Sequence, residues 1–274
     1  MSKAEIKNIY PEELAEFSAR HKESEYVLVD VRQPQEYTQE HIPGARLIPL
    51  HELEGRLGEL DPGRQAVFYC RSGKRSMTAA VLARDSGVFD TDILNLEGGI
   101  TAYQNRVLPD YPRVDIFSGS SDLKTVLSRA VSLEKGAEKF YTGFLESIRD
   151  ESLKDQLQKL AGLERAHARV IFAQGKHLFD EDFDSFFSKA DDSIVEGGLD
   201  VSGWAQKFRQ VNQAELCLYF LEVALEIETM AYDMYRNLAE NKDYPREAAE
   251  CFFRLSEQEK GHMRLVARLF KDCA

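Results

Sequence analysis

The chain has 274 residues, 43% of them hydrophobic, and carries a formal net charge of −12. This length is comfortable for two domains, each with its own hydrophobic core. Because acidic residues outnumber basic ones in both halves of the chain, neither half is expected to bind nucleic acid or an anionic membrane surface.

Residues 1–106 are predicted to form an α/β domain. Apolar segments at 26–30, 66–69 and 92–96 alternate with stretches of helical character, and this arrangement indicates a parallel sheet. The active sites of such sheets gather beyond the carboxyl ends of the strands. Cys70 directly follows the second apolar segment, so we expect it to lie at that edge of the sheet.

Cys70 begins a short loop, residues 70–76, that holds three cations. The backbone N–H groups of such a turn converge on the sulfur, and a helix predicted to begin near Lys74 adds the positive end of its dipole. This arrangement favours a reactive thiolate. The alternative is a small apolar residue that ends a strand beside a loop whose basic residues occur there by chance.

Residues 107–121 are predicted to be a linker, because prolines and a Ser-Gly-Ser-Ser stretch replace the alternating pattern. The remaining segment, 122–274, is helical almost throughout, with Ser121 or Asp122 as the N-cap of its first helix. Apolar residues three and four apart in helices this long indicate a four-helix bundle. Its helices are expected at residues 122–149, 151–178, 211–241 and 245–271.

A long crossover, residues 179–210, joins the second and third of these helices. A short turn would be enough for antiparallel neighbours, so one long connection indicates the ferritin-like topology. The expected architecture is therefore an α/β parallel-sheet domain followed by an all-α, ferritin-like four-helix bundle with one long crossover.

The bundle sequence repeats itself. Residues 130–141 align with 224–235 at an offset of 94, and residues 160–169 align with 255–264 at an offset of 95. Each copy contributes one Glu from its first helix and a Glu-x-x-His from its second, which places carboxylate and imidazole on one helical face. The residues repeated in this way are Glu134, Glu164, His167, Glu228, Glu259 and His262.

Four carboxylates and two imidazoles can meet at the bundle axis and form a metal site. Oxygen and nitrogen donors without thiolate suit iron or manganese, and four glutamates neutralise two divalent ions. A single Glu-x-x-His is more often a solvated helix face, so the prediction depends on the repetition. Tyr141 and Tyr235 each lie seven residues after their glutamate, where they either hydrogen-bond the ligand carboxylates or pack as ordinary core aromatics.

The four cysteines are Cys70, Cys217, Cys251 and Cys273, and none lies close to another in the sequence. Cys217 and Cys251 are predicted to be inert core thiols, and Cys273 an exposed thiol unrelated to catalysis. The first residues lack the apolar core of a signal peptide, and no apolar run approaches the roughly 20 residues that span a bilayer. We therefore expect a reducing, cytoplasmic environment.

Four motifs occur together in the first hundred residues, at positions 29–32, 41–45, 70–76 and 96–100. On these motifs the N-terminal half resembles a single-domain rhodanese. The resemblance implies that Cys70 takes a sulfane sulfur from thiosulfate or from a persulfide donor, becomes a persulfide, and passes the sulfur to cyanide or a thiol. It also implies that Arg75 and the loop hold the persulfide or the anionic donor, and that Asp30 and Arg32 orient the loop. The remaining loop residues are Arg71, Ser72, Gly73, Lys74 and Ser76.

On its repeated Glu and His residues, the helical half is similar to rubrerythrin and related ferritin-like di-iron proteins. The similarity implies that these six residues bind two iron ions, with manganese or zinc as alternatives. Rubrerythrin also has a Cys-x-x-Cys electron-transfer module, which this sequence lacks, and a further ligand glutamate where this chain has Leu225 or Ala231. An external electron donor is therefore implied, and a homodimer through the bundle is expected.

Three functions remain open from the sequence. The first is a rhodanese-type sulfurtransferase fused to a di-iron redox or sensing domain. The second is a di-iron peroxidase or oxidase in which the rhodanese half is an accessory that delivers or binds a partner. The third is a non-enzymatic protein that binds iron and sulfur, and the intact Cys70 loop argues against it.

Overall fold

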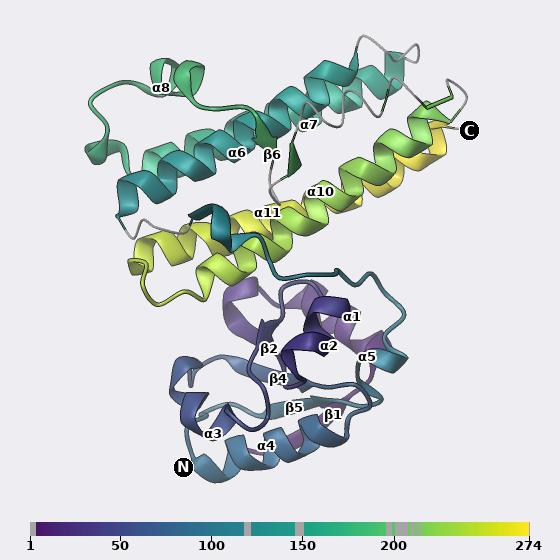
Figure 1. Ribbon diagram of the computed structural model, residues 1–274, viewed down its shortest axis with the longest axis vertical. Helices are drawn as coiled ribbons and strands as arrows, with labels where there is room; N and C mark the ends of the chain where they lie inside the picture. The colour runs from purple at the N-terminus through teal and green to yellow at the C-terminus, as the bar shows by residue number, and fades with distance from the viewer. Residues whose placement is uncertain are drawn as a thin grey trace. The chain divides into compact units, whose positions relative to one another are not determined.

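The computed structural model divides into two compact units, Met1–Tyr111 and Pro112–Ala274 (Figure 1). The first is an α/β unit built on a parallel sheet and the second is helical, which confirms the predicted fold class. The structure describes residues 4–117, 122–145, 151–195, 199–200, 208, 211–212 and 215–273.

The N-terminal unit is built on a five-stranded sheet with the order β1-β5-β4-β2-β3, in which every paired strand is parallel. The sequence predicted β2, β4 and β5 but not the two edge strands, because β1 is largely exposed and β3 has only two residues. The strands are β1 (Ile6–Ile9), β2 (Tyr26–Asp30), β3 (Arg46–Leu47), β4 (Gln65–Tyr69) and β5 (Ile93–Leu96).

Alternate residues of the central strands face opposite sides of the sheet. Val29 and Phe68 pack with α3 and α4 on one side, whereas Leu28 and Val67 pack with α1, α2 and α5 on the other. Cys70 continues β4 on the α4 side. The helices are α1 (Pro11–Arg20), α2 (Pro34–Gln39), α3 (Leu53–Arg56), α4 (Lys74–Ser86) and α5 (Gly99–Ala102), with short 3₁₀ turns at Glu23–Glu25 and Leu57–Glu59.

The C-terminal unit contains four long helices that pack in two pairs, α6 with α7 and α10 with α11 (Figure 1). Asp122 caps the first of them, because its Oδ1 accepts a hydrogen bond of 2.9 Å from the Thr125 N–H. Among the helices within the described ranges, none is long and apolar enough to cross a membrane. The four helices are α6 (Leu123–Phe144), α7 (Glu151–Gln174), α10 (Leu216–Ala239) and α11 (Arg246–Leu269).

The described part of the crossover contains α8 (Phe183–Lys189) and a two-stranded antiparallel ribbon of β6 (Ile194–Val195) and β7 (Leu199–Asp200). Residues 196–198, 201–207 and 209–210 of the predicted crossover lie outside the described residues. The β6 backbone lies directly on α6, where a Cβ at Gly136 would collide with the Ile194 carbonyl. Only glycine permits this approach.

The counterpart of Gly136 in the second copy is Met230, so the two helix pairs differ where the crossover lies.

The predicted linker, residues 107–121, is partly folded. Leu108 exchanges two backbone hydrogen bonds with His41, of 2.8 and 2.9 Å. A 3₁₀ turn, η3 (Val114–Phe117), buries Phe117 against Phe252 in the bundle core, with ring centroids 6.3 Å apart. Proline content suggested a linker along this whole segment, but these two apolar anchors attach its ends to the folded units, and residues 118–121 lie outside the described residues.

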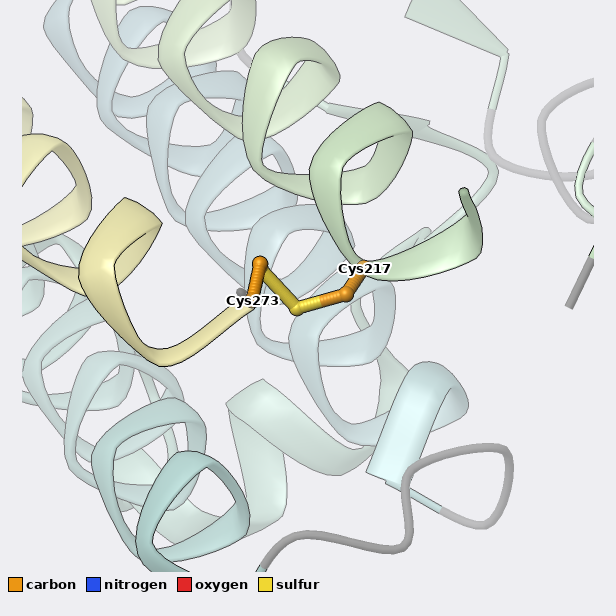
Figure 2. The surroundings of a disulfide bond; sticks show 2 residues. All are labelled: Cys217 and Cys273. Atoms are coloured by element: carbon orange, nitrogen blue, oxygen red, sulfur yellow. A yellow bond between two sulfur atoms is a disulfide. The ribbon is translucent and has the colours of Figure 1, made fainter. Parts of the chain in front are cut away.

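Cys217 and Cys273 form a disulfide (Figure 2), with their Cα atoms 5.5 Å apart. The prediction that both are unpaired thiols is therefore wrong. The two cysteines are 56 residues apart, so no local sequence pattern indicated the pairing. Because α10 and α11 are antiparallel neighbours, the start of α10 lies beside the 3₁₀ turn η7 (Phe270–Cys273) that follows α11. Cys251 is a free, buried thiol, as predicted.

Removing this disulfide is expected to destabilise the bundle. A cross-link over a loop of this length restricts the unfolded chain and contributes about 2–4 kcal/mol to the free energy of unfolding. The double variant Cys217→Ser/Cys273→Ser should lose about that amount in non-reducing denaturant titrations, and a reductant should produce the same loss in the unmodified chain. Equal stabilities with and without reductant, together with four titratable thiols in the non-reduced denatured chain, would contradict the pairing.

Candidate active site and metal centre

Cys70 directly follows β4, in the middle of the sheet, and its side chain is only 1% exposed. Burial alone would raise the pKa of its thiol. Hydrogen bonds from the Ser76 hydroxyl, whose Oγ lies 3.5 Å from Sγ, and from the N–H groups of Ser76, Ser72 and Gly73 outweigh burial and lower the pKa. The loop therefore stabilises a thiolate, or any other anionic sulfur, at this point.

The short helix α5 donates two backbone hydrogen bonds to the start of the Cys70 loop. The N–H of Ile100 donates to the Cys70 carbonyl at 2.9 Å, and the N–H of Thr101 donates to the Arg71 carbonyl at 3.1 Å. Gly99, with a φ of 60°, lies so close that a Cβ would collide with the Cys70 carbonyl oxygen. The Gly-Gly motif at the start of α5 is therefore needed for this close approach.

Arg75 is paired with Glu36 of α2, since its two terminal nitrogens donate to the two carboxylate oxygens at 2.7 Å each. The Arg75 hydrogen bonds hold the pKa of Glu36 at about 2. The Arg75 charge also acts on Cys70, so it adds a cation near the sulfur. Sequence reasoning assigned no role to Glu36, although the sequence contains it shortly after the Val-Asp-Val-Arg motif.

The other predicted loop residues fall into an exposed group and a buried group. Arg71, Ser72 and Lys74 are exposed on the outer side of the loop, whereas Gly73 and Ser76 are buried. The cations of Arg71 and Lys74 therefore face solvent. At that position they would attract an anionic donor from solution.

Asp30 and Arg32 form a buried ion pair next to the strand that leads to Cys70. Arg32 Nη2 lies 2.6 Å from Asp30 Oδ2 and also donates to the Glu40 carbonyl at 2.7 Å. Asp30 is in register with Tyr69, the residue before Cys70. No contact joins this pair to the sulfur among the interactions of the described residues, so its position suits the predicted role in orienting the loop.

In the bundle, the six repeated residues converge in one buried cluster. Each is at most 4% exposed, and the four residues of the two Glu-x-x-His motifs have ligand atoms that all lie within 4.8 Å of one another. The imidazole rings stack with centroids 4.7 Å apart. The cluster consists of Glu134, Glu164, His167, Glu228, Glu259 and His262.

Two glutamates are shared between the histidines and two are not. Glu164 and Glu259 lie 3.5 and 3.4 Å from Nδ1 of His167, and 3.1 and 3.2 Å from Nδ1 of His262. Glu134 lies 3.4 Å from His167 Nδ1. In the same way, Glu228 lies 3.2 Å from His262 Nδ1. The cluster thus has two similar halves joined by the two shared carboxylates.

The tyrosines connect the two helix pairs. Tyr235 of α10 donates a 2.6 Å hydrogen bond to Glu134 of α6, and Tyr141 of α6 donates to Glu228 of α10. Both hydroxyls reach the unshared glutamates, each across to the other copy of the repeat. Of the two roles left open by the sequence, both tyrosines take the hydrogen-bonding one, although they are also fully buried.

The donor set fits divalent metal ions. Buried polar atoms are normally hydrogen-bonded, so several orphaned ones directed at one point suggest an ion as their partner. Among the described residues, the buried atoms without a hydrogen-bond partner include Glu134 Oε2, Glu164 Oε1, His167 Nδ1 and Glu259 Oε1.

Without metal, protons balance the charge of this cluster. Burial raises the pKa of Glu134 to about 7 and that of Glu228 well above its usual value. Burial also opposes charge at Glu164 and Glu259, but the neighbouring histidines outweigh it and lower both pKa values. In turn, the carboxylates outweigh burial and raise the pKa of both histidines. These shifts favour the protonated forms of the two unshared glutamates and of both histidines.

Metal binding is expected to release these protons. Metal ligands must be deprotonated, so filling the cluster below neutral pH should release protons, and metal affinity should rise with pH. Calorimetric titration in two buffers of different ionisation enthalpy measures the release. An affinity that stays constant between about pH 6 and pH 8 would contradict this proton balance.

Removing a tyrosine hydroxyl is expected to weaken metal binding. Tyr235→Phe leaves the Glu134 oxygen without its donor, and loss of such a supporting hydrogen bond lowers metal affinity about 10-fold or more. Tyr244→Phe, which removes a hydroxyl from a ring that packs near Phe252 outside the cluster, is the matched control. Equal iron affinity in both variants, measured by competitive chelation, would argue that Tyr235 only packs.

Comparison with known proteins finds a family match within each half of the chain. The sequence model of the rhodanese-like domain matches residues 13–106, and that of rubrerythrin matches residues 219–274. A sulfurtransferase of Allochromatium vinosum is 41% identical over 83 residues, which are 30% of this chain and 76% of that protein. A putative sulfurtransferase of Bacillus subtilis, YtwF, is 34% identical over 87 residues, or 32% of this chain and 82% of that protein.

Among solved structures, a rhodanese-like domain protein from Staphylococcus aureus is 27% identical, with a TM-score of 0.35, and the match covers 38% of this chain and 98% of that one. The rubrerythrin match covers nearly all of α10 and α11, the second copy of the repeat, and the first copy aligns with that second copy at the repeated Glu and His residues. The chain therefore belongs to the rhodanese-like family through its N-terminal domain, and residues 219–274 of its helical half match the rubrerythrin family.

Proposed function

We propose that the chain is a sulfurtransferase whose nucleophile is Cys70. The thiolate attacks the sulfane sulfur of thiosulfate, the S–S bond of the donor breaks, and sulfite leaves with the electron pair. A nucleophilic acceptor, cyanide or a thiol, then attacks the outer sulfur of the Cys70 persulfide and restores the thiolate. The observation that supports this proposal is the convergence of three N–H groups and a hydroxyl on a buried sulfur.

The loop suits an anionic persulfide as well as a thiolate. The N–H groups of Ser72, Gly73 and Ser76 are fixed dipoles directed at the sulfur, so they stabilise negative charge without reorganising. Arg75 contributes a nearby positive charge while Glu36 holds its guanidinium in place. Arg71 and Lys74, exposed at the outer side, would draw a dianionic donor toward the loop.

The bundle is proposed to hold two iron ions, with manganese or zinc as alternatives. The four glutamates and two histidines of the cluster would hold the ions, and four carboxylates would neutralise the charge of two divalent ions. When bound, such a centre supplies electron exchange with oxygen, peroxide or an external electron donor. The tyrosines hold the unshared glutamates in orientation, and the apolar core around the cluster excludes water.

A second candidate function is a di-iron peroxidase or oxidase in which the rhodanese half delivers or binds a partner. It is favoured by the donor cluster, which is buried and in which tyrosines hydrogen-bond two of the carboxylates. A non-enzymatic role in binding iron and sulfur is the third candidate. A cytoplasmic location, an external electron donor and a homodimer through the bundle remain predictions from the sequence.

Steady-state assays on one preparation separate these functions. The proposed sulfurtransferase forms thiocyanate from thiosulfate and cyanide, and continues to do so when a chelator has removed the metal. Peroxide turnover without thiocyanate formation would favour the second candidate. Retention of iron and sulfur without either turnover would favour the third. If thiocyanate formation changes when the metal is reduced or removed, or if sulfur loading changes the iron spectrum, the two sites are coupled.

A further inference from the structure

Asn95 is a fully buried amide in the middle of β5. Its neighbours in the strand, Leu94 and Leu96, are apolar, and in the sheet it lies between Phe68 of β4 and Asn8 of β1. An amide buried in such surroundings is unfavourable unless its polar atoms are hydrogen-bonded. Its two ends must therefore be occupied, and the identity of its partners indicates what it does.

The partners of Asn95 form a chain from the reactive sulfur to the surface. The Ser76 hydroxyl donates to Asn95 Oδ1 at 2.7 Å, and Asn95 Nδ2 donates to Asn8 Oδ1 at 3.0 Å. The same Ser76 oxygen lies 3.5 Å from Cys70 Sγ and 3.1 Å from the Gly73 carbonyl. Asn8, at the outer end, is exposed.

The Ser76 hydroxyl has one hydrogen, so Asn95 Oδ1, the Gly73 carbonyl and an anionic sulfur compete for it, and Asn95 Oδ1 is the nearest of the three. When Cys70 is a neutral thiol, its S–H can donate to the Ser76 oxygen, which leaves the Ser76 hydroxyl free to donate to Asn95 Oδ1, 2.7 Å away. When the sulfur is anionic, the hydroxyl must turn toward it. Asn95 then has to offer a donor to the Ser76 oxygen in place of an acceptor.

An amide can make that exchange by turning over, because oxygen and NH₂ group occupy similar positions. After the turn, Nδ2 of Asn95 donates to Ser76, and its oxygen faces Asn8. Asn8 is exposed, so its own amide can rotate and donate to that oxygen. The buried side-chain polar atoms of Ser76 and Asn95 then have a hydrogen-bond partner in both charge states of the sulfur.

We propose that Asn95 is a positioning residue for Cys70, whose amide turns over with that of Asn8 to direct the Ser76 hydroxyl toward the sulfur whenever the sulfur is anionic. This inference rests on the proposed role of Cys70 as the nucleophile. The charged group that acts on Cys70 is Arg75 of α4, which in turn interacts with Glu36 of α2 and Asp30 of β2. None of them contacts Asn95 among the interactions of the described residues.

The test is the pH dependence of Cys70 alkylation by iodoacetamide in the full chain, followed by peptide mass spectrometry. Asn95→Asp, once ionised, only accepts hydrogen bonds, so Ser76 stays turned away from the sulfur. The midpoint should move up by about one pH unit, which is a tenfold loss of thiolate. Asn95→Leu does not compete for the hydroxyl, so its midpoint should move down.

Ser76→Ala supplies the matched background, because the hydroxyl through which Asn95 acts is missing. There the difference between the Asp and Leu variants should shrink by at least half. A smaller reduction, or an upward shift for both single variants, would overturn the proposal, since it would reflect plain charge repulsion or a structural defect. If Asn95→Asp does not fold, the Asn95→Leu shift decides: a downward shift supports the proposal, and an upward shift or none overturns it.

Alkylation needs no sulfur donor. A chain that takes no sulfur from thiosulfate but shows these shifts would contradict the proposed function and leave the role of Asn95 standing. Normal sulfur transfer by the unmodified chain, with no shift in either variant, would support the proposed function and contradict the role of Asn95.

Discussion

Cys70→Ser is expected to reduce thiosulfate-dependent sulfur transfer to the uncatalysed background. A serine hydroxyl at this position remains protonated at neutral pH and cannot form a persulfide, so both half-reactions are lost together. The fold should survive, because the side chain is small and its carbonyl keeps the hydrogen bond from Ile100. Thiocyanate formation from thiosulfate and cyanide measures the effect.

Cys251→Ser is the matched control for this substitution. Cys251 is the other free cysteine among the described residues and is also buried, but burial raises the pKa of its thiol to about 11, so it is unreactive at neutral pH. The control should transfer sulfur at the normal rate. Full activity in Cys70→Ser, or equal losses in both variants, would mean that the rhodanese loop is not the site of transfer.

Glu164→Gln is expected to remove metal binding from the bundle. Glu164 is one of the two carboxylates shared by both histidines, so its loss affects the donor set of both ions. Metal that binds only the folded chain stabilises it, by about 2.7 kcal/mol when the free metal is 100-fold above its dissociation constant. The thermal midpoint of the unmodified chain should therefore rise with added Fe²⁺, and that of Glu164→Gln should not.

Glu222→Gln provides the comparison, because Glu222 is an exposed residue of α10 outside the cluster. It should bind metal and gain stability as the unmodified chain does. Sulfur transfer by metal-free protein should persist in both variants. If Glu164→Gln still holds two ions per chain, the shared-carboxylate arrangement is not the metal site.

The metal cluster could be predicted from the sequence because a repeat encodes it. Helical periodicity places Glu164 and His167 on one face, and the second copy repeats that face, so the six residues were expected to meet before any contact was known. The same reasoning could not distinguish shared from unshared glutamates. That distinction depends on how α7 and α11 pack, which no single helix determines.

Contacts between distant segments were the ones that sequence reasoning missed. The Cys217–Cys273 disulfide joins residues 56 apart. Hydrogen bonding by Tyr141 and Tyr235 to the glutamates was one of the two predicted roles, but the sequence did not indicate that each bond crosses from one copy of the repeat to the other. In the N-terminal unit the strand that carries Asn95 was expected, but its bond to Ser76 depends on the packing of α4 against β5. Local patterns predict elements, whereas these pairs depend on the assembled fold.

The central claim is that Cys70 carries the transferred sulfur, and peptide mass spectrometry tests it most directly. After incubation with thiosulfate and removal of excess donor, the peptide that contains Cys70 should gain about 32 Da, the mass of one sulfur atom, and should lose it on addition of cyanide or a thiol. An unmodified Cys70 in the folded chain, or added sulfur found only on another cysteine, would contradict the account.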